Sequence, residues 1–144
     1  MGARRALVVG ASGIAGYSVA QRLLRDGWSV AGIARHAPEG LDGLTQILVD
    51  LHEREAVVEA VGGQRLTHVF YCTWTRGQTE AENCEVNGRM LQNVLDAVTT
   101  EGGVTHVALV TGLKHYQGPF ERYAERHREA PFREDMVRLP VENF

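Results

Sequence analysis

The 144-residue sequence predicts an α/β fold: a doubly wound parallel sheet of five strands covered by helices. Two observations support this class. Five short segments are mostly apolar and largely β-branched or aromatic, and segments with helical periodicity lie between them. Strands that alternate with helices imply right-handed crossovers, which make a sheet parallel. We therefore expect the strand order 3-2-1-4-5, with each strand buried on both faces.

The predicted strands cover residues 6–10, 29–34, 46–50, 68–73 and 106–111. The first helix, over 17–27, places apolar residues on one side and stops at Gly27. A second helix covers 52–63 and ends on Gly62. The third begins with Thr79 and Glu82 in capping-box spacing and continues with an apolar stripe that should cover the sheet. The stripe consists of Val86, Met90, Leu91, Val94, Leu95 and Val98.

Composition and charge exclude several classes of protein. The formal net charge of -3 gives no argument for binding nucleic acid or an anionic membrane surface. No run of 18 apolar residues could span a bilayer, and the first residues lack the pattern of a signal peptide. Cys72 and Cys84 are isolated, so neither a disulfide framework nor a metal site is expected. The sequence predicts a cytoplasmic protein.

The segment 10–16, GASGIAG, lies between the first predicted strand and the first predicted helix. In that context Gly10 permits a tight turn, Gly13 lets the backbone approach a pyrophosphate, and Gly16 lets helix and strand pack closely. The anion would lie at the helix N-terminus, toward which the free N–H groups and the helix dipole point. An ordinary glycine-rich turn is the alternative, but the strand before it and the helix after it favour a Rossmann-type dinucleotide site.

The end of the second predicted strand favours NADP(H). NAD-binding folds place an Asp or Glu about 20 residues beyond the glycines to accept from the ribose 2′-OH. Here that region reads Arg35-His36. A guanidinium binds a 2′-phosphate through two hydrogen bonds, although a solvated surface arginine is the alternative. Asp50, at the end of the third strand, is placed to accept from the adenine amino group, and capping the next helix is its compatible structural role.

Several motifs carry a resemblance that covers nearly the whole chain. The segments GASGIAG, ARH, THVFYCTW, ENCEVN and TGLKHYQGPF resemble the progesterone 5β-reductase/iridoid synthase-like group of atypical extended short-chain dehydrogenases/reductases. This group belongs to the NAD-dependent epimerase/dehydratase superfamily, and THVFYCTW with KHYQGPF is the more specific part of the match. The resemblance implies NADPH-dependent 1,4-reduction of a small-molecule enone or enal, with the enolate oxygen stabilised by a tyrosine and a lysine.

The resemblance assigns the catalytic lysine to Lys114, in the KHY motif. A fixed cation beside the developing oxyanion stabilises the transition state more than the neutral carbonyl. Two departures from the family stand out. His36 replaces a second arginine, which would weaken 2′-phosphate binding or make it depend on pH. The family's catalytic tyrosine lies in a continuation of the form NFYY, whereas this sequence ends at VENF, so the 144-residue chain is expected to be inactive. Tyr116 and Tyr123 fit neither the family's position nor Tyr-x-x-x-Lys spacing and are expected to be structural.

The predicted organisation is an NADP(H)-binding domain over 1–118 and a surface helix and loop over 119–144, which lead toward a missing catalytic and substrate-binding half. The sheet would then be incomplete on its C-terminal side, and an exposed last strand favours a homodimer. The residues expected to bind the cofactor are Gly10, Ser12, Gly13, Ile14, Gly16, Arg35, His36, Asp50, Leu51, Thr73, Trp74, Thr111 and Gly112.

Three functions stay open at the level of the sequence. The first is an NADPH-dependent enone reductase of which this chain is the cofactor-binding portion. The second is a non-catalytic NADP(H)-binding module that senses redox state. The third, an epimerase or dehydratase of sugar nucleotides, is disfavoured because no Tyr-x-x-x-Lys is present.

Overall fold

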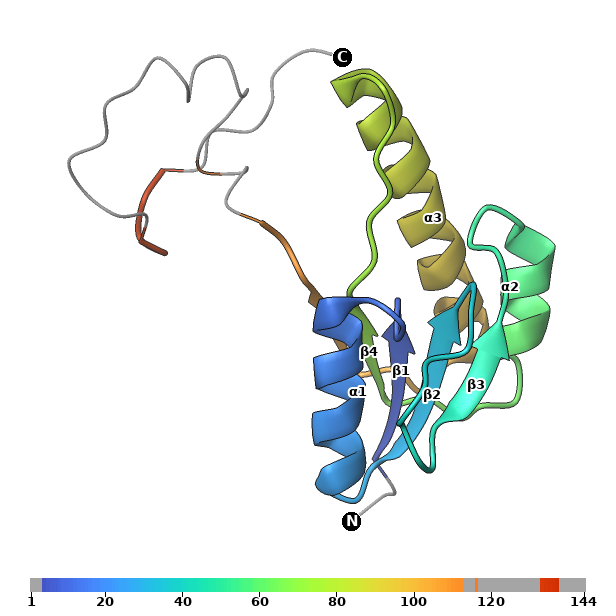
Figure 1. Cartoon of the computed structure of the whole chain (residues 1–144). Helices are drawn as coiled ribbons and strands as arrows, with labels where there is room; N and C mark the ends of the chain where they lie inside the picture. Colours follow the sequence, from blue (N-terminus) through green and yellow to red (C-terminus); the bar gives the residue numbers. More distant parts are fainter. Residues whose placement is uncertain (1–3, 113–115, 117–132, 138–144) are drawn as a thin grey trace. The chain divides into compact units, whose positions relative to one another are not determined.

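The structure, a computed structural model, describes residues 4–112, 116 and 133–137 (Figure 1). Contacts between residues divide the chain into two units, Met1–Val110 and Thr111–Phe144. Most described residues belong to the first unit. Its elements are, in chain order, β1 (Arg5–Val9), α1 (Ile14–Arg25), β2 (Ser29–Ala34), β3 (Thr45–Leu48), α2 (Arg54–Val61), β4 (His68–Tyr71), α3 (Glu80–Glu101) and β5 (His106–Leu109).

The strands form one five-stranded sheet in the order β3-β2-β1-β4-β5. Each neighbouring pair is parallel, which confirms both the predicted strand order and the doubly wound class. The strand order reverses at β1, whose Val9 lies opposite Ile33 of β2 and Tyr71 of β4. The carboxyl ends of β1, β2 and β4 therefore meet at one edge of the sheet, where ligands of such folds bind.

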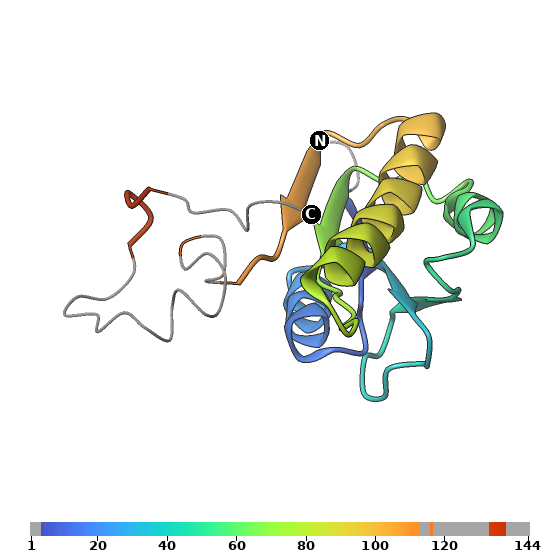
Figure 2. The same cartoon turned by 90° about the horizontal axis from the view of Figure 1, so that it is seen from above.

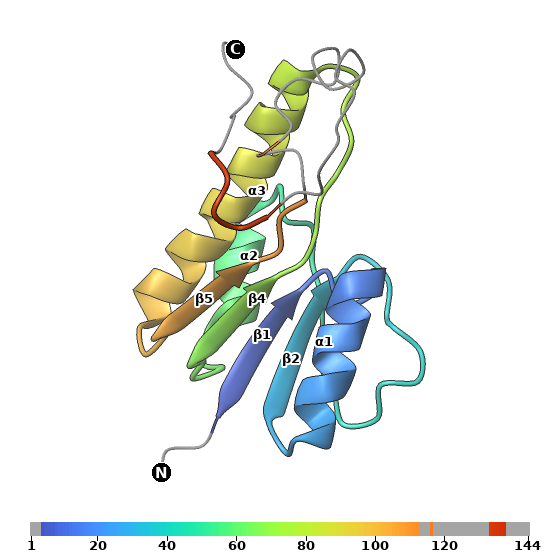
Figure 3. The same ribbon diagram turned by 90° about the vertical axis from the view of Figure 1, so that its left-hand side faces the viewer.

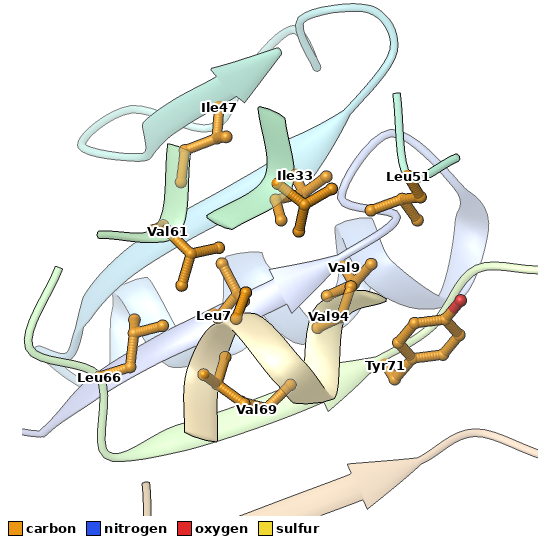
Figure 4. Close-up of a cluster of buried hydrophobic side chains, with 14 of the residues drawn as sticks. Leu7, Val9, Ile33, Ile47, Leu51, Val61, Leu66, Val69, Tyr71 and Val94 are labelled. Carbon is orange, nitrogen blue, oxygen red and sulfur yellow. The ribbon is translucent and has the colours of Figure 1, made fainter. Parts of the chain in front are cut away.

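The sheet has a helical layer on each face (Figures 2 and 3). Helix α1 packs on one face, where it encloses a small core with alternate residues of β1 and β2. Helices α2 and α3 pack on the other face and form the larger core shown in Figure 4. That core contains Leu7, Val69 and Val94, and it includes the ring of Tyr71, whose pKa is raised to about 12 by burial.

Helix ends follow the local signals of the sequence. The Thr79 hydroxyl accepts from the Glu82 N–H at 3.2 Å, and a Glu82 carboxylate oxygen accepts from the Thr79 N–H at 3.3 Å, which confirms the predicted capping box. Gly27 follows α1 with a φ of 77°, a left-handed conformation that favours glycine. Helix α1 itself begins at Ile14, three residues before the predicted start.

The expectation that all five strands are buried on both faces is wrong for β3 and β5. Strand β1 is buried over Ala6–Val9, but β5 is exposed along its whole length and only Ile47 of β3 is buried. Both strands lie at the ends of the sheet in the described part of the chain, so each has a neighbour on one side only. The apolar side chains that sequence periodicity assigns to a core therefore remain partly exposed, as for Val107 and Leu109.

Candidate cofactor-binding site

The turn after β1 is set between the ends of β2 and β4. The Ile33 carbonyl accepts from the N–H groups of Gly10 at 2.8 Å and Ala11 at 3.0 Å, which fixes the turn to β2. Gly10 has a φ of 87°, and a Cβ atom there would lie 2.8 Å from the Thr73 Cβ. Glycine is therefore required at position 10 both by the backbone conformation and by the close approach of the chain after β4.

The other two glycines of the motif differ in their surroundings. A Cβ atom on Gly16 would lie 2.1 Å from the Gly10 carbonyl oxygen, so the first turn of α1 contacts the glycine turn directly. A Cβ atom on Gly13 would meet only that same oxygen, at 3.4 Å. Packing among the described residues therefore requires a glycine at 16 but not at 13.

The N-terminus of α1 has no cap from a side chain. Gly13 is its N-cap residue, and no acidic residue stands in its first turn. Helix α3, by contrast, has the Thr79–Glu82 capping box and two glutamates in its first turn. The first N–H groups of α1 and its positive dipole end are thus left to interact with an anion beside the glycine turn.

A cavity of about 310 Å³ opens at the carboxyl edge of the sheet, at the point where the strand order reverses. Eight of the predicted cofactor-binding residues line it: Gly10, Ser12, Gly13, Arg35, Asp50, Leu51, Thr73 and Trp74. Ile14, Gly16 and His36 are not among its lining residues, although Ile14 is 94% exposed at the start of α1. The cavity thus brings together the ends of β1, β2 and β4 and the loop after β3.

Arg35 and Asp50 are the predicted polar residues on the β2 and β3 side of the cavity. Arg35 is exposed directly after β2 and forms no ion pair with another described residue. An Asp50 carboxylate oxygen accepts from the His52 N–H at 3.0 Å, which makes a local turn. The expected role of Asp50 as a helix cap is wrong, because the N-cap residue of α2 is Glu53 and no side chain bonds there.

Residues that the sequence did not assign to the cofactor site also line the cavity: Ile33, Ala34, Val49, His52, Cys72, Thr75 and Met90. Burial raises the pKa of the Cys72 thiol. Thr75 is held by Asn87 of α3, whose side-chain oxygen accepts from the Thr75 N–H at 2.9 Å and whose amide donates to the Thr75 carbonyl at 2.8 Å. Asn83, one helical turn earlier, accepts from the Gly77 N–H at 2.7 Å. Because the partners of both asparagines are backbone groups, the sequence carried no signal of these contacts.

The predicted residues beyond β5 lie in the second unit or outside the described part. Thr111 and Gly112 are exposed and belong to the unit that starts at Thr111. Lys114 and Tyr123 fall outside the described residues. His106 starts β5, at the sheet edge opposite the cavity, where its ring stacks on that of His68 with the centroids 4.9 Å apart.

Neither a metal centre nor a membrane span is found among the described residues. They contain no group of three or more His, Cys, Asp or Glu side chains that could hold a metal ion. In the same part of the chain, no helix has both the length and the apolar character needed to cross a membrane.

A parallel sheet with a glycine turn, an uncapped helix N-terminus and a cavity at its reversal point is the arrangement of a dinucleotide-binding α/β domain. The chain belongs to the NAD dependent epimerase/dehydratase family, because the model of that family matches residues 6–134. This match covers most of the chain and extends over all five strands of the sheet.

Curated relatives confirm the resemblance to the 5β-reductase and iridoid synthase-like group. The chain is 40% identical over 151 residues to a 3-oxo-Delta(4,5)-steroid 5-beta-reductase of Arabidopsis thaliana. It is 40% identical over 149 residues to an (S)-8-oxocitronellyl enol synthase of Nepeta racemosa, and 36% identical over 150 residues to one of Catharanthus roseus. Each alignment covers 96% of this chain and 38% of the relative, so the chain spans well under half the length of these proteins.

Solved structures confirm the fold. A UDP-glucose 4-epimerase of Thermus thermophilus in complex with NAD has a TM-score of 0.76 at 25% identity, over 94% of this chain and 44% of the epimerase. A short-chain dehydrogenase/reductase superfamily protein of Agrobacterium tumefaciens with bound NAD has a TM-score of 0.72 at 22% identity, over 96% of this chain and 40% of that protein. At these identities the similarity shows a shared Rossmann-type fold.

Proposed function

We propose that this chain binds NADP(H) and forms the cofactor-binding portion of a reductase that acts on enones or enals. The observation that carries the proposal is Gly13. It lines the cavity and is the N-cap residue of α1, whose N-terminus receives no side-chain hydrogen bond. No described neighbour requires it to lack a side chain. A pyrophosphate lying against the backbone at this position accounts for the glycine.

The cavity's polar groups favour NADP(H) over NAD(H). A carboxylate after β2 would accept a hydrogen bond from a free ribose 2′-OH, but this chain has the guanidinium of Arg35 on the cavity wall. Because Arg35 has no carboxylate partner among the described residues, its donors are available to a 2′-phosphate. Asp50 and Leu51, in the loop after β3, would contact the adenine.

The proposed chemistry follows from the relatives. NADPH supplies a hydride, which adds to the β-carbon of the enone or enal, and a proton completes the product at the α-carbon. This chain contributes the cofactor cavity and, through the KHY motif, Lys114 as the cation that stabilises the enolate oxygen. The tyrosine that would act with Lys114 and the walls of the substrate pocket are assigned to the remaining length of the relatives, which this chain does not match.

An activity assay tests whether this chain supplies cofactor binding while the remaining length of the relatives supplies the tyrosine and the substrate pocket. We expect the 144-residue chain to bind NADPH without reducing 2-cyclohexen-1-one, as followed by NADPH absorbance. A chimaera in which this chain replaces the matching part of the Arabidopsis thaliana relative should reduce it. The tyrosine alone accounts for about 10² to 10⁴ in rate, and losing the substrate-binding half also removes substrate positioning.

The variant Lys114→Met in the chimaera separates catalysis from binding. It should lower kcat strongly and change the Kd of NADPH little, since the cation acts on charge that appears only in the transition state. Turnover by the 144-residue chain as fast as by the chimaera would contradict the assignment of the tyrosine and make Tyr116 and Tyr123 the next residues to replace. Binding of NADPH by a chimaera without turnover would favour the non-catalytic redox module.

A further inference from the structure

Asn93 of α3 is a buried amide in the larger core, at 5% exposure, where the Tyr71 hydroxyl is the other buried polar side-chain group among the described residues. It lies between Met90 and Val94 on the buried, otherwise apolar face of the helix. Burying an amide is costly unless its hydrogen bonds are made. The side chain must therefore make contacts that compensate for its burial.

Those contacts are with the loop that forms one wall of the cavity. The Asn93 side-chain amide donates to the Leu51 carbonyl at 2.8 Å and lies 3.4 Å from the His52 carbonyl. These carbonyls belong to the short loop between β3 and α2, outside any ladder or helix. Because a buried carbonyl without a partner is destabilising, the hydrogen bond from Asn93 stabilises the loop in this position.

Helix α3 makes a second contact nearer the surface, with the residue that follows this loop and begins α2. The Arg54 Nε donates to an Asp96 carboxylate oxygen at 3.2 Å, and Gln92 donates to the other oxygen at 2.7 Å. The hydrogen bonds from Gln92 and Arg54 lower the pKa of Asp96. The Asn93 contact is buried and the Arg54 contact is exposed, so α3 holds residues 51–54 at two points.

We infer that Asn93 is a positioning residue for the adenosine half of the dinucleotide. This inference rests on the proposed function. The loop residues that Asn93 holds follow Asp50 directly, and Asp50, Leu51 and His52 all line the cavity on the side of β2 and β3. In doubly wound folds a dinucleotide lies across the reversal of strand order, one nucleotide on each half of the sheet. Asn93 therefore acts through the Asp50–His52 wall and touches no part of the ligand itself.

The test compares two variants of the full chain on the same helix. Asn93→Leu keeps the branching and the number of heavy atoms of the side chain and removes both hydrogen bonds to the loop. Val98→Ala, at a buried position that holds no loop, is the matched control for loss of core packing. Calorimetry measures the Kd of NADPH and of 2′,5′-ADP, an adenosine fragment that carries the 2′-phosphate. Amide exchange over residues 51–54 measures the order of the loop without any ligand.

We expect Asn93→Leu to raise the Kd of both ligands about tenfold and to speed exchange over 51–54, while Val98→Ala leaves both Kd values within about twofold. If both variants lose similar thermal stability and Asn93→Leu binds the two ligands with the Kd values of the wild type, the inference is wrong and the proposed function is unaffected. If the wild-type chain binds neither ligand, the proposed function is wrong. In that case amide exchange still tests the structural role of Asn93. Equal exchange rates over 51–54 in the two variants would show that Asn93 does not order the loop.

Discussion

The Gly10 carbonyl oxygen lies only 2.1 Å from the ideal position of a Cβ atom on Gly16, too close for any side chain there. This contact joins the glycine turn to the first turn of α1 and sets the distance between the helix and the sheet. Gly13 lies between these two residues, yet the nearest atom to its ideal Cβ is 3.4 Å away. The motif therefore contains two glycines that packing requires, Gly10 and Gly16, and one, Gly13, at which packing would allow a side chain.

Alanine substitutions at the two positions should separate stability from binding. Gly16→Ala forces the helix away from the turn and should cost about 1–3 kcal/mol of unfolding free energy or more, measured in urea. Gly13→Ala should cost within about 1 kcal/mol, because it changes an N-cap position with room for a methyl group. It should nevertheless weaken NADPH binding strongly. If Gly13→Ala binds NADPH as the wild type does, the pyrophosphate does not approach this position.

The stacked pair His68 and His106 predicts a pH dependence of stability. Burial lowers the pKa of His68, and the nearby His106 and Arg4 add to the effect. The unfolded chain therefore takes up a proton at a higher pH than the folded one, near 6.5. The unfolding free energy should fall as the pH drops through about 6.5 toward the folded-state value. Urea unfolding between about pH 7.5 and 5 measures this slope.

The variant His68→Phe isolates that contribution. It keeps an aromatic ring against Trp28, whose ring lies edge-on to His68 at 4.8 Å between centroids, and it removes the titrating group. The wild type should lose more stability than the variant over the same fall in pH. Parallel slopes for the two proteins would show that the pair does not contribute.

Strand β5 predicts association of the chain. It lies at the end of the described sheet, and Val107 and Leu109 are about half exposed there. An edge strand with unpaired backbone groups and little charge is a template for pairing with another copy. We expect the 144-residue chain to form dimers or larger species in light scattering at modest concentration. Leu109→Lys should reduce this association, and Thr99→Lys, on the exposed surface of α3, should not. A monodisperse wild-type monomer at high concentration would contradict this prediction.

Local patterns in the sequence were sufficient for the arrangement of the sheet. Alternation of apolar segments and helices predicted the parallel order, and the spacing of Thr79 and Glu82 predicted the start of α3. The prediction that β3 and β5 are buried was wrong, because the exposure of a strand depends on which strands lie beside it. An apolar run has the same sequence pattern in an edge strand as in a central strand. Edge position is a property of the whole sheet.

The candidate site shows the same limit. Residues next to the glycine motif or at strand ends, such as Gly10 and Thr73, were predictable because each adjoins its own local signal. Met90, which lines the cavity, and Asn93, which bonds to a loop 42 residues earlier in the chain, were not. Within an apolar helix stripe, Met90 has the pattern of an ordinary core residue. The partners of Asn93 are backbone carbonyls, which leave no pattern in a sequence.

Arg35 predicts the choice of cofactor and its reversal. Arg35→Asp should accept from a ribose 2′-OH and repel a 2′-phosphate, so the preference for NADPH should narrow or turn into a preference for NADH. His36→Gln tests the neighbouring residue, which is absent from the cavity lining, and should change the preference less. An unchanged ratio of Kd values in Arg35→Asp would assign the 2′-phosphate to another group.

A calorimetric titration of the wild-type chain with NADPH and with NADH tests the proposed cofactor site most directly. An NADP(H) site built from the glycine turn and Arg35 predicts that NADPH binds at least about tenfold tighter, a difference of about 1.4 kcal/mol or more. Equal affinities for the two cofactors, or no heat of binding with either, would contradict it.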